Sequence, residues 1–148
     1  MQIDLSHTVP PYCDLILTRD CFIHLSYRNI ISILSNYKKA KIKFLLVSTN
    51  TYDTRINTDV DGFFIQGRMV NLQRFPFYFK RPIELINEGC TEDDGIYADK
   101  SLGLWKLSEL SLYKAKFNIH LLYIVNLPNR MAEKVRNFYH RMKIFSKF

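Results

Sequence analysis

Apolar and polar positions divide the first third of the chain into a strand, a helix and a second strand. Residues 12–18 (YCDLILT) form a short apolar run after two prolines, and residues 43–50 (KFLLVSTN) form another, so both predict buried strands. Between them, Ser26 is a suitable N-cap for a helix, with Asn29 as a weak partner. The apolar face of that helix consists of Ile30, Ile31, Leu34 and Tyr37. A crossover of this length joins parallel strands, so residues 13–50 predict a right-handed βαβ unit.

Residues 51–82 are a long connection that is rich in aromatic residues and broken by glycines and prolines. Long irregular loops in a compact domain are usually functional. The alternative is that the aromatic side chains of this loop fill the core. The sequence leaves both interpretations open for Phe63, Phe64, Phe75, Phe77, Tyr78 and Phe79.

Two further apolar runs predict an antiparallel hairpin with a long tip. They are residues 82–90 (PIELINEGC) and residues 101–110 (SLGLWKLSEL). The acidic residues 91–100 between them lack the alternating oxygen ligands of a calcium loop, so they predict a solvated turn. In the first run the alternating positions are Ile83 and Leu85, and in the second the positions expected to face inward are Leu102, Leu104 and either Trp105 or Leu107.

The C-terminal quarter of the chain predicts a basic extension. Residues 117–127 (FNIHLLYIVNL) are apolar and fit a helix or a strand. Pro128 suits the first turn of a final helix. The apolar stripe of that helix would consist of Met131, Val135, Phe138, Met142 and Phe145. We therefore expect residues 1–111 to form the main domain and residues 112–148 to form an extension that ends in an amphipathic helix.

Charge is distributed unevenly along the chain. The formal net charge is +7, yet residues 1–111 carry equal numbers of acidic and basic side chains, whereas residues 112–148 carry eight basic side chains and only Glu133. A nucleic-acid interface would therefore have to lie in the extension alone. Its basic residues are not interleaved with aromatic residues on a strand platform, so we do not expect nucleic acid as a partner.

The three cysteines, Cys13, Cys21 and Cys90, are scattered and odd in number, which favours free thiols over a disulfide framework or a zinc site. No basic segment followed by an apolar run lies near Met1, and no apolar run approaches the roughly 20 residues of a membrane-spanning helix. The sequence therefore predicts a cytoplasmic protein without a transmembrane segment and without a bound metal.

Polar residues stand where the two parallel strands are expected to end. Residues 18–20 (TRD) follow the first strand, and residues 48–50 (STN) close the second. Ligands of open α/β sheets lie at the carboxyl ends of the strands. These two clusters therefore predict a ligand cleft at that edge of the sheet.

Five segments follow one another along residues 1–111: DLILTRDCFIHLS, KFLLVSTN, NLQRFPFYF, INEGC and YADKSLGLWKL. In this order they resemble a bacterial family of class I S-adenosylmethionine-dependent methyltransferases. The resemblance implies an α/β fold with part of a Rossmann-like sheet, namely a strand–helix–strand unit, a long loop and an antiparallel terminal hairpin, to which this chain adds a C-terminal helix. The complete family sheet has seven strands, of which the last is antiparallel.

The resemblance also implies that part of the family fold is missing. The two parallel strands would match the fourth and fifth strands of the family, and the hairpin would match the last two. Only twelve residues precede the first strand, and the five glycines of the chain include no G-x-G. The three N-terminal strands and the glycine-rich turn that holds S-adenosylmethionine would therefore be absent, and the chain would be the C-terminal half of a methyltransferase-like domain.

The resemblance assigns roles to four residues. Asp4 matches the acidic position that accepts a hydrogen bond from the adenine of S-adenosylmethionine, and Arg19 and Asp20 match the strand end near the methionine portion and the methyl acceptor. His24 is the candidate catalytic base or acceptor-positioning group. The alternatives are structural: Arg19 and Asp20 would cap the helix and balance each other's charge, and His24 would be a core histidine with satisfied hydrogen bonds.

The sequence therefore predicts a truncated methyltransferase-like protein that is inactive alone. Its intact relatives would transfer a methyl group by in-line displacement to a small-molecule or carbohydrate acceptor. An apolar strand edge left open predicts self-association or a complementing N-terminal half. The alternative is a non-enzymatic interaction module whose basic amphipathic tail binds a partner protein or an anionic membrane surface.

Overall fold

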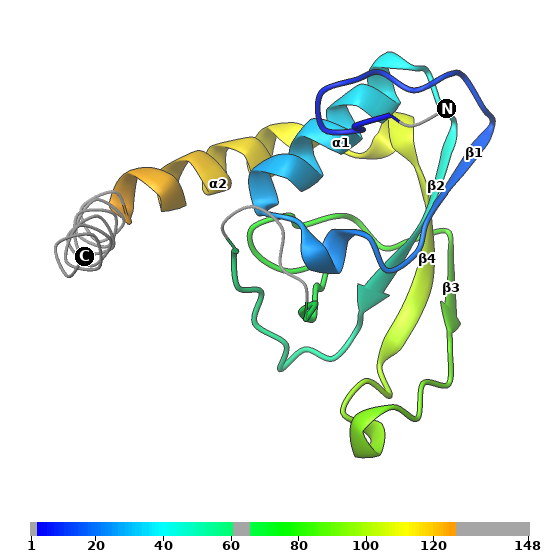
Figure 1. Ribbon diagram of the computed structural model, residues 1–148, viewed down its shortest axis with the longest axis vertical. Helices are drawn as coiled ribbons and strands as arrows, with labels where there is room; N and C mark the ends of the chain where they lie inside the picture. Colours follow the sequence, from blue (N-terminus) through cyan, green and yellow to red (C-terminus); the bar gives the residue numbers. More distant parts are fainter. Residues whose placement is uncertain (1–2, 61–65, 127–148) are drawn as a thin grey trace, which may run out of the picture.

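The computed structural model describes residues 3–60 and 66–126, which form an α/β fold around one mixed four-stranded sheet (Figure 1). The final helix predicted to begin at Pro128 lies outside the described residues. The strands are β1 (Leu15–Thr18), β2 (Phe44–Asn50), β3 (Glu84–Asn87) and β4 (Lys100–Lys106). The helices are α1 (Tyr27–Lys39) and α2 (Leu112–Val125), with short helical turns η1 (Phe22–His24), η2 (Asp93–Gly95) and η3 (Leu107–Glu109).

The strands lie in the order β1-β2-β4-β3, so β1 and β3 form the two edges of the sheet. β1 is parallel to β2, whereas β4 is antiparallel to both of its neighbours, β2 and β3. Three strands consequently point the same way, and the last strand, β4, runs against them. This arrangement confirms the predicted parallel strand–helix–strand unit and the antiparallel hairpin, and it is compatible with part of a Rossmann-like sheet.

Helix α1 begins where the sequence predicts. The hydroxyl of Ser26 accepts a hydrogen bond from the backbone N–H of Asn29 and so caps the first turn. The carboxylate of Asp59 accepts the N–H of Tyr27 at 2.8 Å, which satisfies another open donor of the same turn. The predicted apolar face is buried, and the side chains of Ile30 and Leu34 are completely enclosed. The helix ends at Lys38 and Lys39, where the helix dipole favours cations.

Both helices cover the same face of the sheet, on the left of Figure 1. The sequence of residues 117–127 fits either a helix or a strand. In the structure, residues 117–125 are helical and belong to α2. Helix α2 packs beside α1 in the same core. The aromatic connection fills this core as well, and edge-to-face contacts with centroids 5.2 to 6.2 Å apart link Tyr27, Phe77, Phe79 and Trp105. The described part of that connection therefore supports the core-filling interpretation for Phe77 and Phe79.

The inward positions of β4 differ from the prediction. Ser101, Gly103 and Trp105 are buried, whereas Leu102 and Leu104, which were expected to face inward, lie on the opposite face and are only partly covered. The prediction was wrong because both faces of β4 carry apolar residues. Gly103 is required on the inner face, since a Cβ atom there would lie 2.3 Å from the Trp105 ring. The sequence left Trp105 and Leu107 as alternatives, and both are buried, at 2% and 1% exposed.

The second face of the sheet has no helix over it among the described residues, and this overturns the prediction that β1 is a buried strand. Leu15 and Leu17 of β1 are 46% and 56% exposed because their side chains point to the uncovered face. The register aligns Leu17 with Leu46, and Leu46 with Leu104, so one apolar row crosses three strands. At the other edge every residue of β3 is exposed.

Within the described part of the chain, no helix has the length and apolar character needed to cross a membrane. Cys13, Cys21 and Cys90 are free thiols.

Candidate functional site

A cavity of about 210 Å³ lies at the carboxyl ends of β1 and β2, where the sequence predicts a cleft. Strand ends, the connection after residue 65 and the tip of the β3–β4 hairpin all contribute to it. Most of its lining residues are polar in type. They are Asp20, Ile23, Ser48, Thr49, Asn50, Gln66, Gly67, Arg68, Glu92, Asp93, Tyr97 and Lys100.

Asp20 stands at the centre of this arrangement. Its backbone adopts a left-handed conformation with φ of 50°, which non-glycine residues rarely adopt. Its N–H donates to the hydroxyl of Ser48 at 2.9 Å, and that hydroxyl lies 3.4 Å from a carboxylate oxygen of Asp20. Because Ser48 belongs to β2, these bonds fix the end of β1 against the neighbouring strand. Unusual backbone conformations held in this way are concentrated at functional sites.

Four charged side chains form a network over the strand ends. The Lys100 ammonium lies 2.9 Å from the Asp20 carboxylate and 3.8 Å from Glu88 Oε2. The Arg19 Nε donates to Glu88 Oε1 at 2.6 Å, and its guanidinium lies 3.8 Å from Asp20. Two cations and two carboxylates thus alternate, so the network is neutral. Glu88 Oε2 is buried without a hydrogen-bond partner among the described residues.

The charges in this network stabilise one another. Burial by itself lowers the pKa of the Lys100 ammonium, but the hydrogen bond to Asp20 and the charges of Asp20 and Glu88 outweigh burial and raise that pKa above its ordinary value. The hydrogen bond to Glu88 raises the pKa of the Arg19 guanidinium in the same way. Both side chains therefore remain cationic throughout the physiological pH range.

Residues 66–68 form one wall of the cavity and lie against η1. Gly67 has a φ of 72°, and a Cβ atom there would lie 3.2 Å from Ile23 Cδ1 and 3.3 Å from His24 Cε1. Next to it, the Arg68 guanidinium donates to the backbone carbonyls of Ile23 and Leu25 at 3.0 and 2.6 Å. The Arg68 side chain therefore attaches this segment to the backbone of residues 23–25. Gly67 has no side chain, which allows the segment to approach η1 closely.

Asp99 holds the end of β2 in place beneath the cavity. Its carboxylate is completely buried and accepts hydrogen bonds from the Asn50 side chain and from the N–H groups of Thr51 and Tyr52, each at 3.0 Å. It also pairs with Arg55 at 3.1 Å. Burial by itself raises the pKa of the Asp99 carboxyl, but these hydrogen bonds outweigh it and lower the pKa below the ordinary value.

The structure brings three of the four predicted site residues to this edge of the sheet. Asp20 lines the cavity, Arg19 reaches its rim through Glu88 and Asp20, and His24 lies half-buried beside Gly67. The proximity of Arg19 and Asp20 fits the structural alternative as well, because they partly balance each other's charge.

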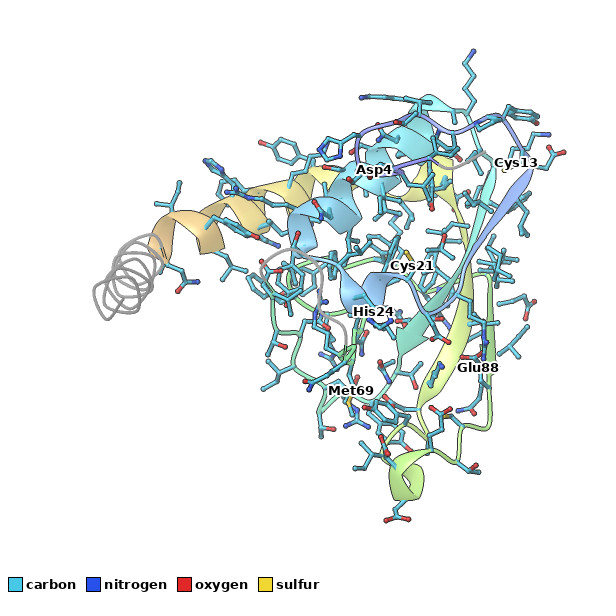
Figure 2. All side chains as sticks on the ribbon, viewed as in Figure 1. Asp4, Cys13, Cys21, His24, Met69 and Glu88 are labelled. Carbon is cyan, nitrogen blue, oxygen red and sulfur yellow. The ribbon has the colours of Figure 1, made fainter. Side chains whose placement is uncertain are left out.

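The fourth residue, Asp4, lies elsewhere. Figure 2 shows it beside the later turns of α1, away from His24 and Glu88. Asn36 of α1 donates to the carbonyl of Leu5 at 2.9 Å and holds this segment there. Hydrogen bonds from the hydroxyl of Ser6 and from His7 lower the pKa of the exposed Asp4 carboxyl to about 2. These local bonds form a turn, and Asp4 does not line the cavity.

Sequence reasoning missed Glu88, Lys100 and the stretch from Gln66 to Arg68 as parts of the site. It also predicted residues 91–100 only as a solvated turn, whereas Glu92, Asp93 and Tyr97 line the cavity. Glu88 and Lys100 flank the two hairpin strands, and both were interpreted only as hairpin residues. Their signal is a charged residue where each hairpin strand meets the hairpin tip, and it becomes informative only once β4 is known to lie beside β2. Among the described residues, no group of three or more potential ligands is arranged to hold a metal ion.

Comparisons with protein-family models, with curated proteins and with solved structures find no match to this chain.

Proposed function

We propose that this chain forms the C-terminal half of an S-adenosylmethionine-dependent methyltransferase-like fold, and that the cavity beside Asp20 is the part of the ligand site contributed by this half. The methyl acceptor in this proposal is a small molecule or a carbohydrate. The chain alone has no methyl-transfer activity in this proposal, because the first half of the fold supplies the glycine-rich cofactor turn.

The observation that carries the proposal is the strand arrangement together with the position of the cavity. β1, β2 and β3 point the same way and the last strand runs against them, which matches what the sequence resemblance implies for the end of a methyltransferase sheet. The cavity opens at the carboxyl ends of β1 and β2, where open α/β sheets bind their ligands. This support is an analogy of fold and site position.

The cavity fits only part of S-adenosylmethionine. Its volume of about 210 Å³ is below the roughly 300–1,000 Å³ of sites that enclose a complete ligand of that kind. Glu92 and Asp93 offer carboxylates to the cationic sulfonium and ammonium groups at the methionine end, and so does Asp20, although its carboxylate also pairs with Lys100 at 2.9 Å. The adenine end has no partner here, since Asp4 lies away from the cavity. A weak, partial site is therefore what this half would provide.

The uncovered face of the sheet agrees with this proposal. In a complete α/β sheet both faces are covered, whereas here Leu15, Leu17 and Ile86 remain between 46% and 58% exposed. β1 is also an edge strand of the sheet, and an edge strand offers backbone groups for pairing with a further strand. In this proposal a complementing half supplies the strand beside β1 and the helices over the exposed face.

Calorimetric titration with S-adenosylhomocysteine, the demethylated product of the cofactor, tests the proposal. We expect weak saturable binding by the chain, and we expect Asp20→Asn to weaken it about tenfold, which is what loss of one charged hydrogen bond typically costs. Asparagine tolerates the left-handed backbone of Asp20, so the substitution removes the charge and its ion pair with Lys100 while keeping the backbone conformation. Asp94→Asn is the matched control, because Asp94 has a φ of 52° and does not line the cavity. Absence of binding at millimolar ligand, or equal binding by wild type and Asp20→Asn, would refute the proposal.

A further inference from the structure

Helix α2 carries two apolar faces, and only one of them is covered by the described residues. Leu112, Ala115 and Ile119 are between 0% and 7% exposed and pack into the core. On the opposite side, Tyr113, Phe117, Leu121 and Ile124 follow one another at spacings of four, four and three residues, which places them along one stripe. We call these four residues the outer stripe.

The outer stripe is open to solvent along its whole length. Its side chains are 78%, 59%, 49% and 54% exposed in chain order. Figure 1 shows the end of α2, in yellow and orange, extending past α1. Single exposed apolar residues are common on soluble proteins, but a continuous stripe of large ones marks an interaction surface.

Charge on α2 indicates what this surface binds. Lys114 lies on one side of the outer stripe, and Lys116 lies on the other side with His120. The sequence of α2 contains no acidic residue. The opposite face of α2 is buried in the core, so α2 has no separate polar face of the kind that a free interfacial helix carries. Its exposed aromatic stripe between lysines nevertheless suits an anionic membrane surface, where lysine stems extend toward the headgroups.

The distribution of charge along the sequence also favours an anionic membrane surface as the partner of the outer stripe. Residues 112–148 carry eight basic side chains and one acidic side chain. Each lysine or arginine near an anionic lipid surface adds to attraction. A second copy of α2 would offer no acidic side chain to pair with Lys114 or Lys116, so charge complementarity favours lipid over an α2–α2 dimer.

From these observations we propose that the outer stripe of α2 docks this protein on an anionic phospholipid surface. The stripe lies on α2 and shares no residue with the cavity beside Asp20. This docking surface is therefore independent of the proposed methyltransferase-like function, and an experiment can refute either proposal without refuting the other.

Flotation of the full chain with lipid vesicles tests the docking surface. We expect binding to vesicles of phosphatidylcholine mixed with phosphatidylglycerol, and little binding to phosphatidylcholine alone. Raising the salt from about 0.1 M to about 1 M shortens the Debye length from about 10 Å to about 3 Å and should weaken the binding. The double substitution Phe117→Gln and Leu121→Gln should weaken it about a hundredfold, since burying each large apolar side chain contributes roughly a factor of ten.

The matched control removes two exposed apolar side chains from elsewhere. Ile56 is 86% exposed and Tyr78 is 54% exposed, so the double substitution Ile56→Gln and Tyr78→Gln should leave vesicle binding unchanged. Emission from Trp105, the single tryptophan, checks that each variant remains folded. Equal binding to neutral and anionic vesicles, or full binding by the α2 double variant, would overturn the proposal. A dimer in lipid-free solution that the α2 double variant abolishes would also overturn it, by assigning the stripe to a second copy.

Discussion

Arg19 and Glu88 form an ion pair that connects the two edges of the sheet at the carboxyl ends of β1 and β3. Arg19 follows β1 at one edge of the sheet and Glu88 follows β3 at the other edge, yet Arg19 Nε donates to Glu88 Oε1 at 2.6 Å. Glu88 is 12% exposed, and its second oxygen lies 3.8 Å from the Lys100 ammonium. The pair therefore spans the ends of β2 and β4 and helps to position Lys100 beside Asp20.

This geometry predicts a measurable coupling between Arg19 and Glu88. A double-mutant cycle with Arg19→Met and Glu88→Gln should give a favourable coupling free energy that exceeds that of a fully exposed pair, because Glu88 is only 12% exposed, although Arg19 is 53% exposed. Urea unfolding of the four proteins measures it. The exposed pair Lys106 and Glu109 is the control and should give about 0.3 kcal/mol. Equal coupling in the two cycles would show that the Arg19–Glu88 pair does not stabilise the site.

Asp99→Asn should destabilise the fold by about 3 kcal/mol, the usual cost of breaking a buried charge pair. An asparagine amide cannot accept from both N–H groups of Thr51 and Tyr52 while it also pairs with Arg55. Chemical unfolding at neutral pH measures the loss. Asp53→Asn is the control, because Asp53 is 87% exposed and its pair with Arg74 lies at the surface, and it should change stability by less than about 1 kcal/mol.

The stability contribution of Asp99 should also depend on pH. The pKa of its carboxyl is lower in the folded chain than in the unfolded chain, so the unfolded chain binds more protons between the two values. The contribution is therefore fully present above the ordinary aspartate pKa of about 3.9 and is lost as the pH falls below it toward the folded value. Wild type and Asp99→Asn should converge in stability over that acid range. A constant difference would contradict the assignment.

Gly67→Ala should cost more stability than Gly89→Ala. Both glycines have positive φ, 72° and 61°, so both substitutions incur the roughly 1–2 kcal/mol of a left-handed alanine. Only at Gly67 would the new methyl group press against Ile23 and His24, since nothing lies within 4 Å of the Cβ position at Gly89. We expect an excess loss of about 1 kcal/mol at Gly67, measured by thermal unfolding. Equal losses would mean that the segment moves away from η1 without cost.

The open edge of β1 predicts self-association of the chain. Leu17 is 56% exposed beside unpaired backbone groups, and edge strands with apolar residues pair with other chains. We expect the weight-average mass to rise with protein concentration in sedimentation experiments, and Leu17→Lys to reduce that rise. Ile56→Lys, in an exposed loop, should have no effect. A concentration-independent monomer would show that the edge is protected.

Local patterns were sufficient to predict most of the elements. Ser26 and the spacing of Ile30, Leu34 and Tyr37 fixed α1, because capping and helical periodicity act within a few residues. Local patterns did not predict which residues of β4 point toward the helices and which point to the uncovered face of the sheet. Leu102 and Leu104 are as apolar as Trp105, and only the helices over one face decide which of them is buried.

The site was predictable only where its residues belong to strand ends. Asp20 and Ser48 stand directly after or within apolar runs, so their place at the edge of the sheet follows from the parallel strand–helix–strand unit. Glu88 and Lys100 reach the same place through the order β2-β4-β3, which involves contacts between residues far apart in the sequence. Asp4 was assigned by resemblance, and in the structure its position depends on local bonds to Ser6 and His7.

The most direct test is an amide NMR titration of the isotope-labelled chain with S-adenosylhomocysteine. We expect shift changes at the backbone amides of Asp20, Thr49, Gly67 and Lys100, which line the cavity, and none at Ser6 beside Asp4. The changes should follow one weak binding curve, because this half contributes only part of the site. Perturbations at other residues alone, or none at millimolar ligand, would contradict a methyltransferase-like site at the ends of β1 and β2.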